Sequence, residues 1–158
     1  MSFSRIVVGV GAVLLHNDKI LLVKRKHSPC AGYWAIPGGR VEYGEPLYSA
    51  VERELFEETG VRAKPIGVVW VAEIPPGTCK DQVDGEHFVL IDFLMEAQEP
   101  ITVKPGTDAI VADFYKLSNP PEPLTPITKA LIKYLRIISK RGELYTRLIP
   151  AKWWEAFA

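Results

Sequence analysis

Three glutamates lie within five consecutive positions of the segment RELFEETGV, residues 53–61. Glu54, Glu57 and Glu58 have the i, i+3 and i+4 spacing that brings side chains together on one face of a helix. Like charges at this spacing destabilise a helix by about 0.2–0.5 kcal/mol per pair, and the helix dipole disfavours anions near the C-terminal end. A hard divalent cation, Mg²⁺ or Mn²⁺, would offset this repulsion because it prefers oxygen ligands. The alternative interpretation, without a ligand, is an acidic helix end exposed to solvent.

A helix is predicted over residues 46–59, and its apolar positions help to decide between the two interpretations. At about 100° per residue, the apolar side chains share one side of the helix: Leu47, Ala50, Val51 and Leu55. Glu54 and Glu58 project within the same arc, Glu57 borders it, and Glu52 points the other way. Arg53 can offset one acid, such as Glu57 four residues on. The three acids are therefore expected to face the body of the protein, where burial is costly unless the charges are compensated, and this favours a metal site.

The surrounding elements predict a sheet that is covered on both faces. Apolar segments rich in β-branched residues predict strands over residues 5–15, 20–25, 66–74, 87–96 and 110–117, with a turn at 16–19 that makes the first two a hairpin. A short strand is predicted over 33–36, a polar loop over 75–86, and a final helix from Thr125 to Gly142. This order of elements favours a single domain over residues 1–158 with a three-layer α/β architecture.

The composition argues against several classes of partner. The 158 residues carry a formal net charge of zero, so no overall field attracts a nucleic acid polymer or an anionic membrane. No apolar run reaches the roughly 18 residues needed to span a bilayer. Cys30 and Cys79 belong to no Cys/His cluster, which predicts two reduced thiols in a cytoplasmic protein rather than a disulfide or a zinc site. Trp153, Trp154 and Phe157 predict packing on the domain's own surface, with a homodimer contact as the alternative.

A longer pattern surrounds the three glutamates. From Gly39 the chain reads GRVEYGEPLYSAVERELFEETGV: glycine, five residues, glutamate, seven residues, then Arg-Glu-apolar-any-Glu-Glu-any-Gly-apolar. This stretch, residues 39–61, resembles the Nudix box of the Nudix hydrolases. All its fixed positions are filled: Gly39, Glu45, Arg53, Glu54, Leu55, Glu57, Glu58, Gly60 and Val61. The segments YWAIPGG and EPLTP also resemble the family, so the resemblance spans most of the chain.

The resemblance implies a Nudix fold, a mixed β-sheet between helices, and an enzyme that hydrolyses a nucleoside diphosphate linked to another moiety. It implies that the three glutamates bind Mg²⁺ or Mn²⁺ together with the carbonyl of Gly38. Arg53 would orient one glutamate, while Gly39, Glu45 and Gly60 would support the box. Gly38 and Gly39 are expected to form a tight turn that also lets the backbone approach metal and phosphate closely.

Pyrophosphate hydrolysis fits these residue types. Metal ions can bind both phosphates, neutralise developing charge and lower the pKa of a bound water. A glutamate that is not fully used by the metal can then accept the water's proton, and Glu57 or Glu58 is expected to do so. Asp81, Asp84 and Glu86 of the later polar loop are the alternatives.

The residues that would recognise the rest of the substrate are less constrained. Arg25 could contact a phosphate, and Tyr33 and Trp70 could stack on a base, although solvent exposure or core packing explains each equally well or better. Glu86, at the end of the polar loop, is a further candidate. Asp92 is an acid within an otherwise apolar strand, so it needs a partner, either an arginine or the base.

Two substrate classes compete. The segment GYWAIPGGRVEYGE resembles the ADP-ribose pyrophosphatases, which favours ADP-ribose or a similar nucleotide sugar, cleaved to AMP and ribose 5-phosphate. The segments VGVGAVLL and HFVLIDF also resemble family members that cleave (d)NTPs to release pyrophosphate. A third class, a module that senses a nucleotide without cleaving it, is disfavoured because all the box glutamates are present.

Overall fold

The computed structural model describes residues 4–82 and 85–138. Its elements, in chain order, are β1 Arg5–His16, β2 Lys19–Arg25, β3 Trp34–Ala35, β4 Gly38–Arg40, α1 Leu47–Thr59, β5 Ala63–Ile74, β6 Glu86–Ala97, β7 Ala109–Lys116 and α2 Pro126–Ile138. All five longer strands were predicted within three residues at either end, and both helices begin within one residue of the expected position. The predicted end of the last helix at Gly142 and the three aromatic residues of the tail lie outside the described residues.

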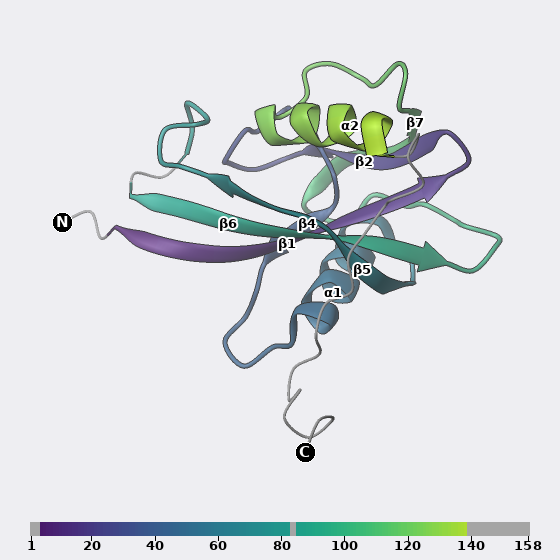
Figure 1. Ribbon diagram of the computed structural model, residues 1–158, viewed down its shortest axis with the longest axis horizontal. Helices are drawn as coiled ribbons and strands as arrows, with labels where there is room; N and C mark the ends of the chain where they lie inside the picture. Colours follow the sequence, from purple (N-terminus) through teal and green to yellow (C-terminus); the bar gives the residue numbers. More distant parts are fainter. Residues whose placement is uncertain (1–3, 83–84, 139–158) are drawn as a thin grey trace.

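The sheet is mixed, with β1 at its centre (Figure 1). Strand β1 runs parallel to β6 over ten residue pairs, and antiparallel to β4 and to the start of β2. Strand β5 extends the sheet beyond β6, while β3 and β7 pair with β2. The parallel pairing is possible because α1 and β5 intervene between β1 and β6 and carry the chain back to the same end.

The two helices cover opposite faces of the sheet (Figure 1). Val51 and Leu55 of α1 pack in one core cluster with Phe93. Leu131 and Leu135 of α2 belong to a second cluster, on the other face. The strands supply both clusters because successive side chains of a strand point to opposite faces: Leu14 and Leu21 join the first cluster, and Val13, Ile20 and Leu22 the second. The predicted α/β/α arrangement is therefore confirmed.

The segment before α1 corrects one expectation. Gly38 and Gly39 were predicted to form a tight turn, but they lie in strand β4, where Gly38 is opposite Gly11 and Gly39 is opposite Val10. Neither has a positive φ. Their missing side chains matter for proximity instead, because a Cβ on Gly38 would stand 2.2 Å from the carbonyl oxygen of Val10. Two extended strands can approach this closely only where one of them carries no side chain.

The ends of α1 follow the sequence closely. Pro46 occupies the N-cap position, and its carbonyl accepts a bond from the amide of Ala50 at 2.9 Å. Gly60 ends the helix with φ of 69°, a left-handed conformation that glycine adopts without steric cost. Within the described part of the chain, no helix has the length and apolar character needed to cross a membrane.

Candidate active site

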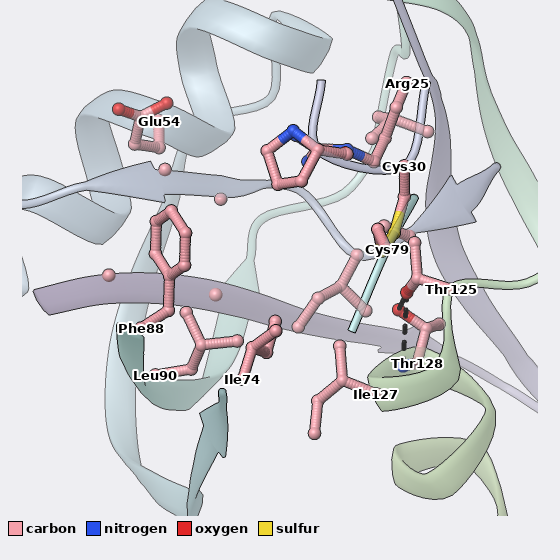
Figure 2. A pocket seen from close by; sticks show the side chains of 18 of the residues that line it. Arg25, Cys30, Glu54, Ile74, Cys79, Phe88, Leu90, Thr125, Ile127 and Thr128 are labelled. Carbon is pink, nitrogen blue, oxygen red and sulfur yellow. Dashed lines mark hydrogen bonds between the residues drawn. A yellow bond between two sulfur atoms is a disulfide. The ribbon is translucent and has the colours of Figure 1, made fainter. Parts of the chain in front are cut away.

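One cavity of about 440 Å³ lies on the α2 side of the sheet and reaches the C-terminal half of α1. The polar side chains that line it include Glu54, Glu58 and Arg25, and its apolar lining includes Ile36, Ile74, Phe88, Leu90, Ile127 and Leu131. Figure 2 shows Glu54 at one end, with the Cys30–Cys79 pair and the N-terminus of α2 at the other. The cavity therefore joins an acidic site to an apolar chamber.

Glu54 and Glu58 enter the cavity from α1, as the helix periodicity predicts. Glu58 is only 9% exposed, and its Oε2 accepts a hydrogen bond from the amide of Gly38 at 3.2 Å. The Glu54 side chain is 15% exposed and lies against Gly39, where an added Cβ would stand 2.4 Å from Oε1. The expectation that all three acids face the body of the protein is wrong for Glu57: it borders the apolar arc, so its side chain is 54% exposed and does not line the cavity.

Arg53 forms hydrogen bonds with three acids of the box, Glu45, Glu54 and Glu57. Its Nε and Nη2 donate to the two carboxylate oxygens of Glu45 at 2.7 and 3.1 Å, and Nη1 donates to Glu54 at 2.8 Å. The expected contact with Glu57 is confirmed at 3.2 Å. Arg53 also donates to the carbonyl of Arg40 at 3.1 Å, which ties the helix to β4. The guanidinium keeps the pKa of Glu45 below its usual value, chiefly through the hydrogen bond between them.

The electrostatics of the two inward acids differ from those of Glu45. Burial raises the pKa of Glu58 to about 8, and the neighbouring charge of Glu54 adds to the shift, while the bond from Gly38 and the charge of Arg25 oppose it. Burial also raises the pKa of Glu54, against the opposing effect of Arg53. The two carboxylates thus share one largely buried site in which nearby positive groups offset their charge only in part, and a positive ligand would relieve their repulsion.

The donor set fits a hard divalent cation. Among the described residues, no three His, Cys, Asp or Glu side chains are already arranged to hold a metal ion. Glu54 and Glu58 nevertheless both lie against β4, Glu54 beside Gly39 and Glu58 bonded to the amide of Gly38. Mg²⁺ is commonly bound by one or two carboxylates, with substrate phosphates completing the shell. The two glutamates are therefore suited to hold such an ion together with a phosphorylated substrate.

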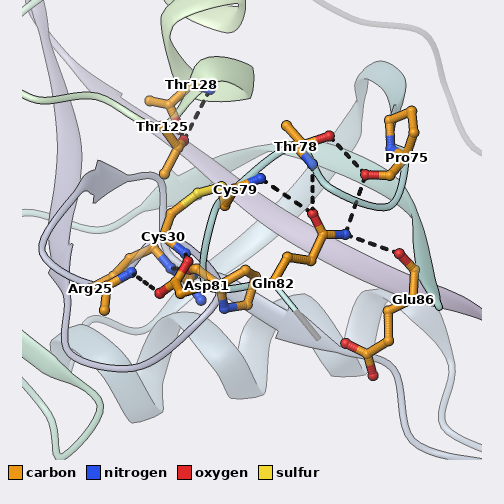
Figure 3. Close-up of a disulfide and its surroundings, with 12 residues drawn as sticks. Arg25, Cys30, Pro75, Thr78, Cys79, Asp81, Gln82, Glu86, Thr125 and Thr128 are labelled. Atoms are coloured by element: carbon orange, nitrogen blue, oxygen red, sulfur yellow. Dashed lines mark hydrogen bonds between the residues drawn. A yellow bond between two sulfur atoms is a disulfide. The ribbon is translucent and has the colours of Figure 1, made fainter. Parts of the chain in front are cut away.

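The two cysteines correct a second expectation. Cys30, in the loop after β2, forms a disulfide with Cys79, in the loop after β5, with Cα atoms 5.5 Å apart (Figure 3). The prediction of reduced thiols was wrong because it used sequence spacing, and 49 residues separate the pair. Both cysteines line the cavity. The cytoplasmic location, which drew in part on free thiols, stays a prediction.

Hydrogen bonds reinforce the same loop junction (Figure 3). Asp81 accepts from the amides of Cys30 and Ala31 at 2.6 and 3.0 Å, and these bonds lower its pKa. Gln82 is 9% exposed and bonds to backbone groups within the 75–86 segment, including the amide of Thr78 at 3.0 Å and the carbonyl of Glu86 at 3.0 Å. The polar loop is thus folded around its own side chains and fixed to the β2–β3 loop.

The four residues expected to contact the rest of the substrate have different positions. Arg25 lines the cavity, and its Nε donates to the carbonyl of Pro29 at 2.7 Å. Tyr33 and Trp70 do not line it; Trp70 stacks on Tyr134 of α2, with ring centroids 5.6 Å apart. Glu86 is 2% exposed and forms ion pairs with Arg5 and Arg40. Their contact with substrate stays a prediction, and of the four Arg25 alone is positioned at the cavity.

Several cavity residues were missed or left unassigned by sequence reasoning. Lys26, His27 and Asp108 line the cavity near Arg25, and Nε2 of His27 lies 3.5 Å from Oδ1 of Asp108. Asp92 also lines it, so its position in an apolar strand was a usable signal. No sequence signal identified Asp108, because β2 and β7 come together only in the folded sheet.

The fold and site define a class: an α/β/α protein with a carboxylate pair in a partly apolar cavity. The model of the NUDIX domain matches residues 5–135. The chain therefore belongs to the Nudix hydrolase family.

Individual relatives agree with this assignment. The chain is 36% identical over 129 residues to a Methanocaldococcus jannaschii protein named ADP-ribose pyrophosphatase, covering 82% of this chain and 73% of that one. It is 44% identical over 63 residues to a putative 8-oxo-dGTP diphosphatase of Bacillus subtilis, covering 40% of each. A MutT Nudix hydrolase structure from Burkholderia pseudomallei superposes with a TM-score of 0.72 at 31% identity, covering 83% and 98%.

Proposed function

We propose that this chain is a metal-dependent pyrophosphohydrolase that cleaves the diphosphate of ADP-ribose or a similar nucleotide sugar. The observation that supports this most directly is the placement of Glu54 and Glu58 at one end of a 440 Å³ cavity whose remainder is largely apolar. A charged diphosphate suits the first end, and a flat nucleoside suits the second. The name of the archaeal relative agrees with this substrate class.

Glu54, Glu58 and the carbonyl of Gly38 would hold Mg²⁺ or Mn²⁺. A bound divalent ion would neutralise phosphate charge and make a bound water more acidic. Arg53 fixes the orientation of Glu54 through a 2.8 Å hydrogen bond and is itself fixed by Glu45. The chain's own contribution is therefore a rigid acidic site that positions the diphosphate beside the attacking water.

Glu58 is the best-placed group to accept the proton of that water. It lines the cavity, whereas Glu57 is directed to Arg53 and solvent. Of the loop acids, Glu86 is held by two arginines, Asp81 by two amides, and Asp84 lies outside the described residues. In the proposed step the water oxygen bonds to phosphorus, the bridging P–O bond breaks, and the proton passes to Glu58. The products are AMP and ribose 5-phosphate.

A substrate panel tests this proposal. Purified protein is incubated with ADP-ribose, other nucleotide sugars and (d)NTPs, in Mg²⁺ or Mn²⁺ and with or without EDTA, and products are separated by anion-exchange chromatography. We expect ADP-ribose to give AMP and ribose 5-phosphate only when metal is present. Turnover that EDTA does not affect, or no turnover of any nucleotide, would contradict the proposal.

Three variants of one helix locate the activity. Glu54→Gln and Glu58→Gln keep the side-chain shape but remove the charge, and we expect each to lower kcat by about a hundredfold or more at saturating Mg²⁺. Glu52→Gln is the matched control, because Glu52 pairs with Lys64 at 3.1 Å and does not line the cavity. Near-normal turnover in both cavity variants would refute the assignment.

The alternative substrate class is a (d)NTP, cleaved with release of pyrophosphate. The local identity to the Bacillus protein favours it, but the aligned 63 residues are too few to cover the whole cavity. The same panel distinguishes the two classes by their products. A sensing module without turnover is disfavoured because all the box glutamates are present. A homodimer and a cytoplasmic location stay predictions.

A further inference from the structure

Asp92 is a buried acid on the floor of the cavity with one carboxylate oxygen uncommitted. The residue is 2% exposed and lines the cavity. Its Oδ2 accepts the indole N–H of Trp70 at 2.5 Å. Within residues 4–82 and 85–138, no donor bonds to Oδ1. Oδ1 lies beside Gly11, which lines the cavity as well.

The strand beside Asp92 makes room for this oxygen. Gly11 of β1 is the register partner of Asp92, and a Cβ on Gly11 would stand 2.1 Å from Oδ1. The same strand has Gly9 opposite Leu90, where a Cβ would stand 2.8 Å from the leucine side chain. Two glycines thus allow the side chains of β6 to lean over β1. The two glycines, Leu90 and Asp92 all line the cavity, with Oδ1 beside Gly11.

The chemistry of this oxygen is that of a hydrogen-bond acceptor. Burial raises the pKa of Asp92 to about 6, with the bond from Trp70 opposing the shift, so the group is ionised at pH 8. An ionised carboxylate has no proton to donate. Leaving its free oxygen beside a carbonyl of a bound base would leave two acceptors facing each other, while an amino group would satisfy it.

We propose that Asp92 is the specificity-determining residue for the base: Oδ1 accepts a hydrogen bond from the amino group of an adenine-type ring and rejects a ring with an oxo group there. The proposal rests on the proposed function, since it places the nucleoside in the apolar part of the cavity and the diphosphate at Glu54 and Glu58. Trp70 acts as a positioning residue, because its indole N–H keeps Oδ2 occupied and directs Oδ1 to the base.

The position of Trp70 makes the substitution Asp92→Asn unusually informative. An indole N–H must be matched by an oxygen, so the asparagine carbonyl replaces Oδ2 and the amide NH₂ replaces Oδ1. The acceptor at the cavity then becomes a donor. The variant should therefore favour a 6-oxo ring, such as hypoxanthine, over adenine.

The experiment compares ADP-ribose with IDP-ribose, which differ in the base alone. The wild-type protein, Asp92→Asn and the control Asp113→Asn are assayed for kcat/KM at pH 8, and Kd values for AMP, IMP and purine riboside 5′-monophosphate are measured by calorimetry. Asp113 is exposed on β7 and lies outside the cavity lining. We expect the wild-type and control proteins to prefer the amino base by about tenfold or more, and Asp92→Asn to lose or reverse that preference. Circular dichroism and thermal melting establish that the variants are folded.

The outcomes separate this proposal from the proposed function. An amino-to-oxo ratio that is equal in wild type and Asp92→Asn would overturn the role of Asp92, even if ADP-ribose is hydrolysed. No hydrolysis of either compound would contradict the proposed function, while the Kd ratio of AMP to IMP would still decide on Asp92. If Asp92→Asn does not fold, Trp70→Phe replaces it, and an unchanged ratio in that variant overturns the positioning of Oδ1.

Discussion

The two ends of the cavity are built in different ways. The acidic end comes from one continuous stretch, residues 39–61, in which α1 places Glu54 and Glu58. Arg53 of the same helix bonds Glu54 directly and is itself held by Glu45. The apolar end is assembled from segments far apart in the chain: β1, β6, the 26–33 and 75–85 loops, and the start of α2. A continuous motif can therefore fix the reaction type, while the substrate depends on how distant segments meet.

The apolar end of the cavity is held together by contacts between segments that are distant in the sequence. The Cys30–Cys79 disulfide ties two loops that would otherwise be independent, and Asp81 adds two backbone hydrogen bonds between them. At the start of α2, the hydroxyl of Thr125 accepts the amide of Thr128 at 3.3 Å, as an N-cap does. Each junction can be altered without touching Glu54 or Glu58, so the two ends can be tested separately.

The largest effects of a substitution are expected at β4, where adding a methyl group to one of two adjacent glycines should lower stability and to the other should lower activity. A Cβ on Gly38 would stand 2.2 Å from a backbone oxygen, whereas a Cβ on Gly39 would meet the movable carboxylate of Glu54. We expect Gly38→Ala to lower the free energy of unfolding by more than about 4 kcal/mol. Gly39→Ala should fold almost normally but lose most of its activity. Urea unfolding and a turnover assay measure the two effects, and equal stability losses would contradict the distinction.

The next largest effect is expected from loss of the Cys30–Cys79 disulfide, which should lower the free energy of unfolding and raise KM. Closing a loop of this length stabilises a protein by about 4 kcal/mol in the chain-entropy model. We expect Cys30→Ser, Cys79→Ser or treatment with a dithiol reductant to lower the free energy of unfolding by an amount of this order. Because the bridge lies at the apolar end, KM should rise more than kcat falls.

The double variant Cys30→Ser/Cys79→Ser is the control for the reductant. It should match each single variant in stability and should not respond to the dithiol. A wild-type protein whose unfolding midpoint and KM are both unchanged by complete reduction, verified by thiol titration, would show that the bridge has neither role.

The smallest of the three effects is a dependence of stability on pH. Burial raises the pKa of Asp92 to about 6 from a usual value of 3.8, so the folded protein holds this proton more tightly than the unfolded chain does. The resulting stabilisation is complete below pH 3.8 and is lost as the pH rises through 6. Relative to Asp92→Asn, the wild-type free energy of unfolding should therefore fall by about 2 kcal/mol between pH 4 and pH 7. Urea titrations of both proteins measure it, and a pH-independent difference would contradict the burial of a titrating acid.

Much of the fold could be predicted because its signals are local. Continuous apolar strands, the helical spacing of Leu47 to Leu55 and the left-handed Gly60 each depend on neighbouring residues. The inward direction of Glu54 and Glu58 followed from the same periodicity. The β4 strand was mistaken for a turn because glycine permits both, and its pairing with β1 is a tertiary contact.

The sequence by itself determined the α/β class, the placement of the carboxylates on α1 and the family, because a motif of 23 residues carries its own geometry. Only the tertiary structure decided that Cys30 meets Cys79, that Glu86 is held by Arg5 and Arg40, and that Asp92 faces the cavity beside Gly11. These contacts join residues that are 46 or more positions apart. Such contacts depend on strand register and loop packing, which have no local sequence signature.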